Sequence, residues 1–209
     1  MTKFFFIGFN KTGTSTYHNT LSPYIRSTHN IKWPKKSRNA KNLDYFKKFD
    51  CYSDGELADF KRLAEAFPDA NFILNTRGLY SWIYSRIKHI YRNYPGGAKG
   101  WMAREWHSYS DKSKIIKLWI TRRNNYYRKV LRYFHNRTNF KLLNISDKNL
   151  KGKLESFTGF PIKKVVNSNI QHKDLPVVQG FTPDIYKAFM SLGIKEEDYN
   201  TPNLIIYVK

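Results

Sequence analysis

The feature that most constrains the fold is an apolar run near the N-terminus that leads directly into a loop rich in glycine and hydroxyl residues. Phe4–Ile7 is continuously apolar and not alternating, which is typical of a parallel strand covered on both faces. The loop after it holds Gly8 and Gly13 on either side of Lys11. A helix is expected from about Thr14 to Leu21. The chain therefore begins with a strand, a tight loop and a helix, which is the opening unit of an α/β fold.

Two later apolar runs predict further buried strands, over 71–76 and 140–145. Helical spacing predicts helices over 54–67, 79–91, 112–134 and 150–157. Residues 26–42 show no periodicity and are interpreted as a loop, and 204–208 as an edge strand. Because strands alternate with helices, we expect parallel βαβ units with right-handed crossovers. The fold class is α/β, with three α/β/α layers around a mainly parallel sheet.

A chain of 209 residues predicts one domain. Within it we expect a binding core over 1–160 and a C-terminal extension over 161–209 that packs on this core. The single cysteine, Cys51, excludes an intrachain disulfide. The early apolar run, Phe4–Phe9, is too short for a membrane span or a signal sequence, so we expect a soluble, cytoplasmic protein.

Charge is the second strong feature of the composition. Lysine and arginine total 37 against 16 aspartate and glutamate residues, which gives a formal net charge of +21. No acidic residue occurs in 1–43 or in 112–146. We expect basic surfaces that attract anionic partners over long range.

The loop before the first helix has the chemistry of an anion site. Backbone N–H groups at a helix N-terminus bind phosphate, and Gly13 allows close approach of the backbone. The hydroxyl residues Thr12, Thr14, Ser15 and Thr16 add donors, and Lys11 adds a positive charge. A nucleoside-triphosphate loop has its lysine directly after the second glycine, where this chain has Thr14. The only candidate metal ligand after a strand is Asp147, which is poorly placed, so we predict a phosphate site without a metal.

A second anion-binding element follows the strand at 71–76. Arg77 stands at its carboxyl end, where ligands of open α/β sheets bind. Ser85 follows eight positions later in the next helix, one turn after Ser81. A guanidinium and a hydroxyl at this place suit a second phosphate, so the two elements together predict a ligand with two separate phosphate groups.

These residues resemble a known family. Lys11-Thr12-Gly13-Thr14-Ser15 after a buried strand resembles the 5′-phosphosulfate loop of sulfotransferases, and Thr76-Arg77 with Ser85 resembles their 3′-phosphate site. The segment 67–77, followed by Trp82 and Ser85, looks like the small cytosolic-type sulfotransferases of bacteria and their viruses. The resemblance covers about residues 3–160 and implies the P-loop NTPase-like sulfotransferase fold.

The resemblance implies a donor, a reaction and residue roles. The donor would be 3′-phosphoadenosine 5′-phosphosulfate (PAPS), the product 3′-phosphoadenosine 5′-phosphate (PAP), and the reaction metal-free, in-line transfer of a sulfuryl group to a hydroxyl or amine. Lys11 would stabilise the bridging oxygen. The residues implied for the 5′-phosphate are Lys11, Thr12, Gly13, Thr14, Ser15 and Thr16, and those for the 3′-phosphate are Arg77 and Ser85. Two positions depart from the family: Gly78 replaces an acidic or amide residue, and Thr16 replaces an adenine-stacking tryptophan.

The acceptor also requires a general base. Sulfotransferases use a histidine or carboxylate before the arginine-bearing strand, and we select Asp54, followed by His29 and Glu56. Two structural roles compete with this assignment: Asp54 before Gly55 can cap a helix, and His29 can be a loop residue.

Two other function classes stay open. Cations interleaved with aromatic residues, as in Trp119…Tyr126-Tyr127, are compatible with nucleic-acid binding, although these aromatic residues also lie near the apolar stripe of a helix. A P-loop kinase with a degenerate loop is the third reading. For a sulfotransferase, the basic surface suits an anionic glycan as acceptor, but a small molecule fits the sequence equally well.

Overall fold

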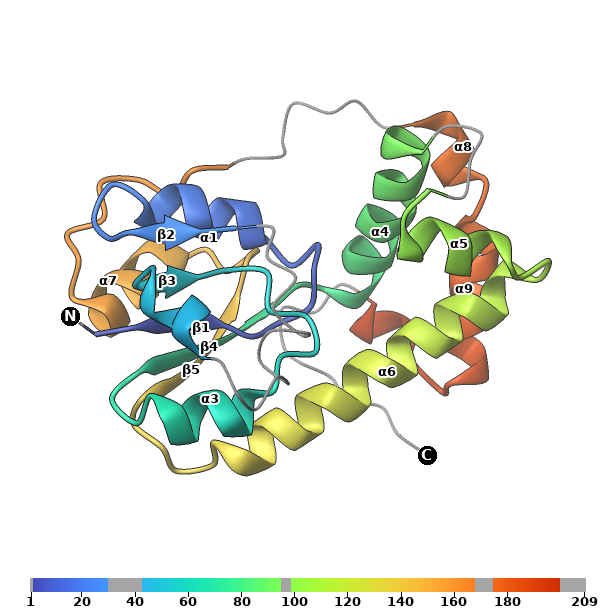
Figure 1. Cartoon of the computed structure of the whole chain (residues 1–209). Helices are drawn as coiled ribbons and strands as arrows, with labels where there is room; N and C mark the ends of the chain where they lie inside the picture. Colours follow the sequence, from blue (N-terminus) through green and yellow to red (C-terminus); the bar gives the residue numbers. More distant parts are fainter. Residues whose placement is uncertain (1, 30–42, 95–98, 168–174, 200–209) are drawn as a thin grey trace. The chain divides into compact units, whose positions relative to one another are not determined.

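The computed structural model describes residues 2–29, 43–94, 99–167 and 175–199 (Figure 1). The chain forms two compact units. The first comprises Met1–Arg77 and Tyr127–Gln171, and the second comprises Gly78–Tyr126 and His172–Lys209. The strand predicted over 204–208 and most of the loop predicted over 26–42 lie outside the described residues.

The first unit is built on a parallel sheet with the strand order β2-β3-β1-β4-β5. Its strands are β1 (Phe4–Phe6), β2 (Ser27–Thr28), β3 (Cys51–Tyr52), β4 (Asn71–Thr76) and β5 (Phe140–Asn144). In the register of the sheet, Phe5 of β1 lies opposite Tyr52 of β3 on one side and Phe72 of β4 on the other. The prediction of a parallel α/β sheet is confirmed, and β1 is its middle strand.

Helices cover both faces of this sheet, which confirms the three-layer prediction (Figure 1). The helical elements of the first unit are α1 (Thr14–Leu21), η1 (Asp44–Lys47), α3 (Phe60–Ala66), the end of α6 (Lys112–Tyr133) and α7 (Leu150–Thr158). Side chains alternate along β1: Phe4 and Phe6 share a buried cluster with residues of α1 and α7. Phe5 points to the other face. The continuous apolar run therefore fills two cores at once.

The second face carries an aromatic layer. The ring of Phe5 stacks on Phe72 at 5.3 Å, and Phe72 lies 4.8 Å from Phe134 just after α6. Phe134 stacks on Phe140 of β5 at 4.8 Å, and Phe60 of α3 lies 5.9 Å from it. All of these rings except the partly exposed Phe140 are buried. This layer holds β1, β4 and β5 in line against α3 and the end of α6.

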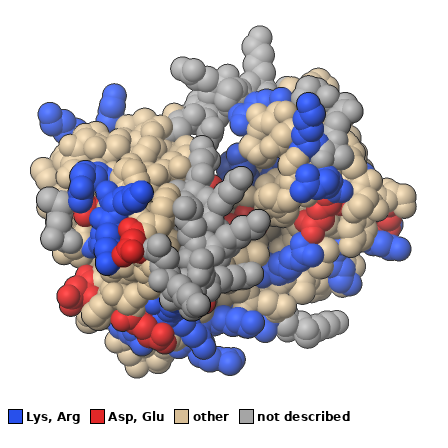
Figure 2. Space-filling view, viewed as in Figure 1, with Lys and Arg blue, Asp and Glu red and all other residues tan. Residues whose placement is uncertain are grey.

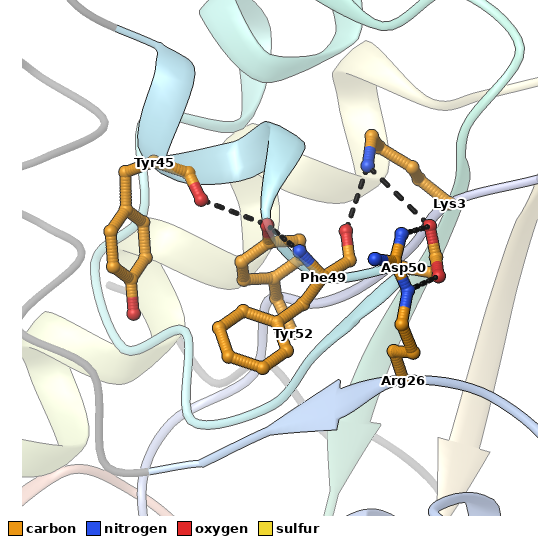
Figure 3. A network of polar contacts seen from close by, with 6 residues as sticks. All are labelled: Lys3, Arg26, Tyr45, Phe49, Asp50 and Tyr52. Atoms are coloured by element: carbon orange, nitrogen blue, oxygen red, sulfur yellow. Dashed lines mark hydrogen bonds and ion pairs between the residues drawn. The ribbon is translucent and has the colours of Figure 1, made fainter.

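A polar network ties the amino ends of β1 and β3 together (Figure 3). Arg26 Nε donates to the buried carboxylate of Asp50 at 2.8 Å, and this bond lowers the pKa of Asp50. Lys3 Nζ donates to the Phe49 carbonyl at 2.7 Å, and the Tyr52 hydroxyl accepts the Phe49 N–H at 2.9 Å. The backbone N–H of Phe4 donates to the Asp50 carbonyl at 2.7 Å. The network fixes the end of the sheet opposite the glycine-rich loop.

The second unit consists of helices in its described residues. They are α4 (Leu79–Asn93), α5 (Trp101–His107), the first part of α6, α8 (Pro176–Gln179), α9 (Thr182–Ser191) and η2 (Glu196–Asp198). Trp106 stacks on Trp119 at 5.6 Å, and both are buried. The sequence predicted α4 and α6 but not α5, α8 or α9. Within the described parts of the chain, no helix combines the length and apolarity that a membrane span requires.

Candidate active site

Three candidate segments of the first unit lie at the same edge of the sheet. The glycine-rich loop follows β1, Asp54 follows β3, and Arg77 follows β4. Since β1 pairs in parallel with both β3 and β4, the carboxyl ends of these strands meet at one edge. Ligands of open parallel sheets bind at this edge.

Two residues of the loop have left-handed φ values, which are common in backbone turns that bind anions. Lys11 has φ 63° and Gly13 has φ 91°, and α1 begins at Thr14. A Cβ atom on Gly13 would lie 2.6 Å from the Ile145 side chain, so both the dihedral and the space require glycine. The Tyr17 N–H makes the first bond of the helix, to the Gly13 carbonyl. The N–H groups of the preceding turn have no intrahelical acceptor and are suited to bind an anion.

Asn75 of β4 clasps both ends of this loop. Its Oδ1 accepts the Gly8 N–H at 2.8 Å, and its Nδ2 donates to Thr12 Oγ1 at 2.6 Å. The Thr12 hydroxyl in turn donates to the Phe9 carbonyl. Asn75 and Thr12 are fully buried, and a Cβ on Gly8 would lie 2.0 Å from the Asn75 carbonyl oxygen. Gly8 therefore lets β4 approach the loop closely enough for the clasp to form.

Tyr127 completes this clasp from the end of α6 that belongs to the first unit. Its hydroxyl donates to the Asn75 carbonyl at 3.1 Å and accepts the Phe9 N–H at 3.2 Å. Tyr127 is fully buried, and its ring packs edge-on against Phe9 at 5.7 Å. Sequence reasoning missed Asn75 and Tyr127 as parts of the site.

The predicted hydroxyl donors of the loop differ in their exposure to solvent. Thr12, Thr14 and Thr16 are buried, with at most 6% of their surface exposed, whereas Ser15 is partly exposed. The Thr12 hydroxyl is used inside the protein by the clasp, which leaves its backbone as the part that can serve a ligand. The assignment of the six residues Lys11–Thr16 to the 5′-phosphate stays a prediction.

If the loop binds adenosine 3′,5′-bisphosphate, the product that the family resemblance implies, replacing Asn75 with alanine should weaken this binding at least about tenfold. It should also lower the free energy of unfolding by roughly 2–4 kcal/mol. The reason is that two buried groups, the Gly8 N–H and the Thr12 hydroxyl, lose their partner. Calorimetric titration and chemical denaturation measure the two effects.

The matched control is Asn139→Ala, at the other end of the sheet, where Asn139 Nδ2 donates to the Ala70 carbonyl at 2.8 Å. This variant should lose stability and keep its affinity for the bisphosphate. Equal affinities of Asn75→Ala and the wild type would contradict a role of the clasp in shaping the loop.

Asp54 lies beside the loop in an unusual conformation. Its φ is 73°, in the left-handed region that residues other than glycine rarely adopt and that is common at functional sites. The Thr14 side chain hydrogen-bonds its carboxylate, and both Lys11 and Glu56 are close enough to act on it electrostatically. Burial, followed by Glu56, raises the pKa of Asp54 to about 6. A carboxylate with this pKa is suited to accept a proton near neutral pH.

The competing assignment, that Asp54 caps the following helix, is wrong. The helix predicted over 54–67 begins only at Phe60, and Asp59 is its N-cap, with a side-chain oxygen that accepts the Arg62 N–H at 3.4 Å. The residues before it are irregular, and Leu57 also has a positive φ of 59°. Asp54 therefore does not cap α3.

The two other candidates for the base hold parts of the loop. Glu56 Oε2 accepts the Asn10 N–H at 3.4 Å. His29 Nε2 lies 3.0 Å from Ser15 Oγ, and its Nδ1 lies 2.9 Å from Ser53 Oγ. His29 directly follows the two-residue strand β2 in the segment interpreted as a loop, so that prediction is wrong at 27–28.

Arg77 also reaches the loop. Its Nη1 donates to the Lys11 carbonyl at 3.4 Å, and burial lowers the pKa of its guanidinium. Ser85 lies on α4 in the second unit and is partly exposed. The prediction that Arg77 and Ser85 share a phosphate stays a prediction.

The structure explains the aromatic residues that suggested nucleic-acid binding. Trp119, Tyr126 and Tyr127 are at most 8% exposed, so their rings are core and not a stacking platform. Figure 2 shows Lys and Arg side chains dispersed over the viewed face of each unit, with smaller acidic patches between them. Among the residues that the structure describes, no group of three or more His, Cys, Asp or Glu side chains is placed to hold a metal ion.

Comparisons with known proteins agree with this geometry. Residues 3–149 match the model of a protein family described as "Sulfotransferase domain". A solved sulfotransferase from Alicyclobacillus acidocaldarius is similar in structure, with a TM-score of 0.51 and 14% sequence identity over 95% of this chain and 98% of that chain. At this identity the likeness shows the fold. A search among curated proteins found no match.

Proposed function

Because the chain belongs to the sulfotransferase family, we propose that it transfers a sulfuryl group from PAPS to a hydroxyl or amine of an acceptor. The observation that carries this proposal is that Lys11 follows β1 and Asp54 follows β3 at the same edge of the sheet, where Lys11 acts electrostatically on the Asp54 carboxylate. A cation and a carboxylate of raised pKa, next to a loop suited to bind an anion, are the groups that metal-free group transfer from a phosphosulfate needs.

In this proposal the glycine-rich loop and the end of β4, whose Asn75 bonds to that loop, bind the nucleotide. The backbone N–H groups at Gly13, Thr14 and Ser15 hold the 5′-phosphate, supported by the open turn at Gly13 and the N-terminus of α1. Arg77 and Ser85 are assigned to the 3′-phosphate from their sequence pattern. The donor supplies the activated sulfuryl group, and the fixed dipoles of the loop favour its negative charge.

Lys11 and Asp54 act on the two ends of the transfer. Asp54 accepts the proton of the acceptor as the acceptor's oxygen or nitrogen bonds to sulfur. Lys11 neutralises the charge that develops on the phosphate oxygen from which the sulfuryl group departs. The two side chains affect each other electrostatically. Lys11 lowers the pKa of Asp54 and so favours the ionised carboxylate, the form that can accept a proton at neutral pH.

A panel of ligands tests the donor class. Adenosine 3′,5′-bisphosphate at about 100 times its dissociation constant should stabilise the protein by about 2.7 kcal/mol. For a chain of this size that corresponds to a rise in Tm of roughly 5–10 °C. ATP with magnesium and an oligonucleotide are measured in parallel by thermal shift, because they represent the kinase and the nucleic-acid readings.

Stabilisation by ATP with magnesium but not by the bisphosphate would overturn the proposal in favour of a kinase. Binding of the oligonucleotide alone, with affinity that falls steeply with salt, would favour a nucleic-acid-binding protein. If the bisphosphate binds, screening acceptors with sulfur-labelled donor identifies the substrate. Anionic glycans are the first class to screen because the chain carries a net charge of +21.

A further inference from the structure

We propose that His29 is a positioning residue of the phosphate loop, which directs the Ser15 hydroxyl hydrogen and takes up one proton when that hydroxyl turns to a bound phosphate. The inference rests on the proposed function, because the phosphate is the 5′-phosphate of the proposed donor. It gives His29 a role on the nucleotide side of the site and not as the base for the acceptor.

One direction of the hydrogen-bond chain around His29 makes hydrogen bonds of all three of its side-chain contacts. Ser53 Oγ lies 3.2 Å from the Thr28 carbonyl, which can only accept, so the single hydroxyl hydrogen of Ser53 is used there. In this direction the N–H of the ring donates across the 2.9 Å contact between His29 Nδ1 and Ser53 Oγ. A neutral imidazole has one N–H, which leaves a lone pair on Nε2. The Ser15 hydroxyl therefore donates to Nε2 at 3.0 Å.

The surroundings of the ring keep it neutral in the free protein. His29 is partly buried, and the ring of His18 from α1 stacks on it at 5.7 Å with an angle of 17° between the planes. Burial is the largest effect, and His18 and Lys11 add to it, so that the pKa of His29 falls to about 4. These two groups are the titratable neighbours that act on the ring from α1 and from the loop, and β3 is followed by the neutral hydroxyl of Ser53.

A phosphate at the N-terminus of α1 reverses the bond between Ser15 and His29. To donate to a phosphate oxygen, the Ser15 hydroxyl must turn its hydrogen away from His29, and two lone pairs would then face each other over 3.0 Å. A proton taken from solvent by Nε2 restores the bond, now with His29 as donor and Ser15 Oγ as acceptor. The imidazolium adds a positive charge near the phosphate, which favours its own formation. One N–H bond forms, and no other covalent bond changes.

Calorimetric titration with adenosine 3′,5′-bisphosphate tests this linkage. Titrations in two buffers of different ionisation enthalpy give the number of protons taken up on binding. The wild type should take up more protons than His29→Gln, by up to one, and the excess should grow as the pH falls from about 7.5 to about 5.5. The affinity of the wild type relative to His29→Gln should rise by up to about tenfold for each unit by which the pH falls.

The matched control is His18→Gln, which removes the stacked histidine and leaves His29 and Ser15 in place. Because burial and not His18 is the largest cause of the low pKa of His29, this variant should keep most of the proton uptake of the wild type. The phosphates of the ligand titrate in the same range, but their contribution is common to all variants and cancels in the comparison.

Nitrogen NMR of the histidine rings gives a second reading on the wild type, which does not depend on whether a variant folds. The His29 ring should carry its hydrogen on Nδ1 in the free protein and on both nitrogens in the complex at about pH 6. Equal proton uptake by the wild type and His29→Gln, or a His29 ring still neutral in the complex at about pH 5.5, would overturn the inference and leave the proposed function intact. No binding of the bisphosphate at any pH would instead contradict the proposed function.

Discussion

Replacing Lys11 with asparagine is expected to lower kcat for sulfuryl transfer by about 10²- to 10³-fold while the affinity for the nucleotide changes less than about tenfold. This is the loss seen when one preorganised group that stabilises developing charge is removed. Asparagine is chosen because Lys11 has φ 63°, a conformation that asparagine tolerates well, so the loop keeps its shape. Turnover is measured with labelled donor and an acceptor from the screen.

Two further variants separate charge from structure. Lys11→Arg keeps the cation and should retain more activity than Lys11→Asn. Lys3→Gln removes another partly buried lysine, at the opposite end of β1, whose Nζ donates to the Phe49 carbonyl. It should affect stability and leave turnover unchanged. An unchanged kcat in Lys11→Asn would remove Lys11 from the mechanism.

The long, strongly patterned elements could be predicted from the sequence. The strand at 71–76 and the helices that became α1, α4, α6 and α7 have enough residues for an apolar period to be read. Strands β2 and β3 have two residues each, too few for any period. Their place in the sheet is set by partners such as the pair of Arg26 with Asp50, which no local pattern records.

The helix predicted over 54–67 shows why a local pattern can mislead at a functional site. The spacing of Leu57 with Phe60 and Leu63 suits a helix, yet Asp54 and Leu57 have positive φ values that no helix allows. The helix begins after Asp59, which caps it. The surrounding tertiary contacts, including the Gly55 N–H bonded to the Phe6 carbonyl, outweigh the local preference.

The residue types of the candidate site could be predicted from the sequence, but the distant residues that hold its loop in place could not. The glycine and lysine spacing indicated an anion loop, because that chemistry needs those residues at that spacing. Asn75 bonds to Gly8 across 67 positions and Tyr127 to Phe9 across 118 positions. A single sequence holds no signal for such distant pairs. The contacts that link Ser53, His29 and Ser15 likewise become visible only in the structure.

Replacing Asp54 with asparagine is expected to lower kcat by about 10²- to 10⁴-fold, the contribution typical of a positioned general base, and to leave nucleotide affinity nearly unchanged. Asparagine suits φ 73° as well as aspartate does, so the backbone is not a confounding factor. Because the base must be ionised and its pKa is about 6, kcat/KM of the wild type should rise with pH through about 6 and level off above it. The residual activity of Asp54→Asn should lack this rise.

The same substitution should stabilise the protein, which a merely structural aspartate would not do. The pKa of Asp54 is about 6 in the folded protein against an ordinary value of 3.8, so the folded state binds more protons between these values. Stability contributed by this group is therefore present at low pH and is lost as the pH rises towards 6. Asparagine cannot ionise, and Asp54→Asn should gain roughly 1–3 kcal/mol over the wild type at about pH 8, and little at about pH 4.

Thermal unfolding of both proteins at the two pH values measures this difference, as a rise in Tm of roughly 2–4 °C for each kcal/mol. Asp59→Asn is the control, because asparagine caps a helix as well as aspartate, and neither turnover nor stability should change with it. A variant Asp54→Asn that lost stability equally at both pH values would mean that its carboxylate is held by favourable bonds. A carboxylate held in that way has a lowered pKa and is a weaker base. If Asp54→Asn kept full turnover and also lost stability, Asp54 would not be the general base.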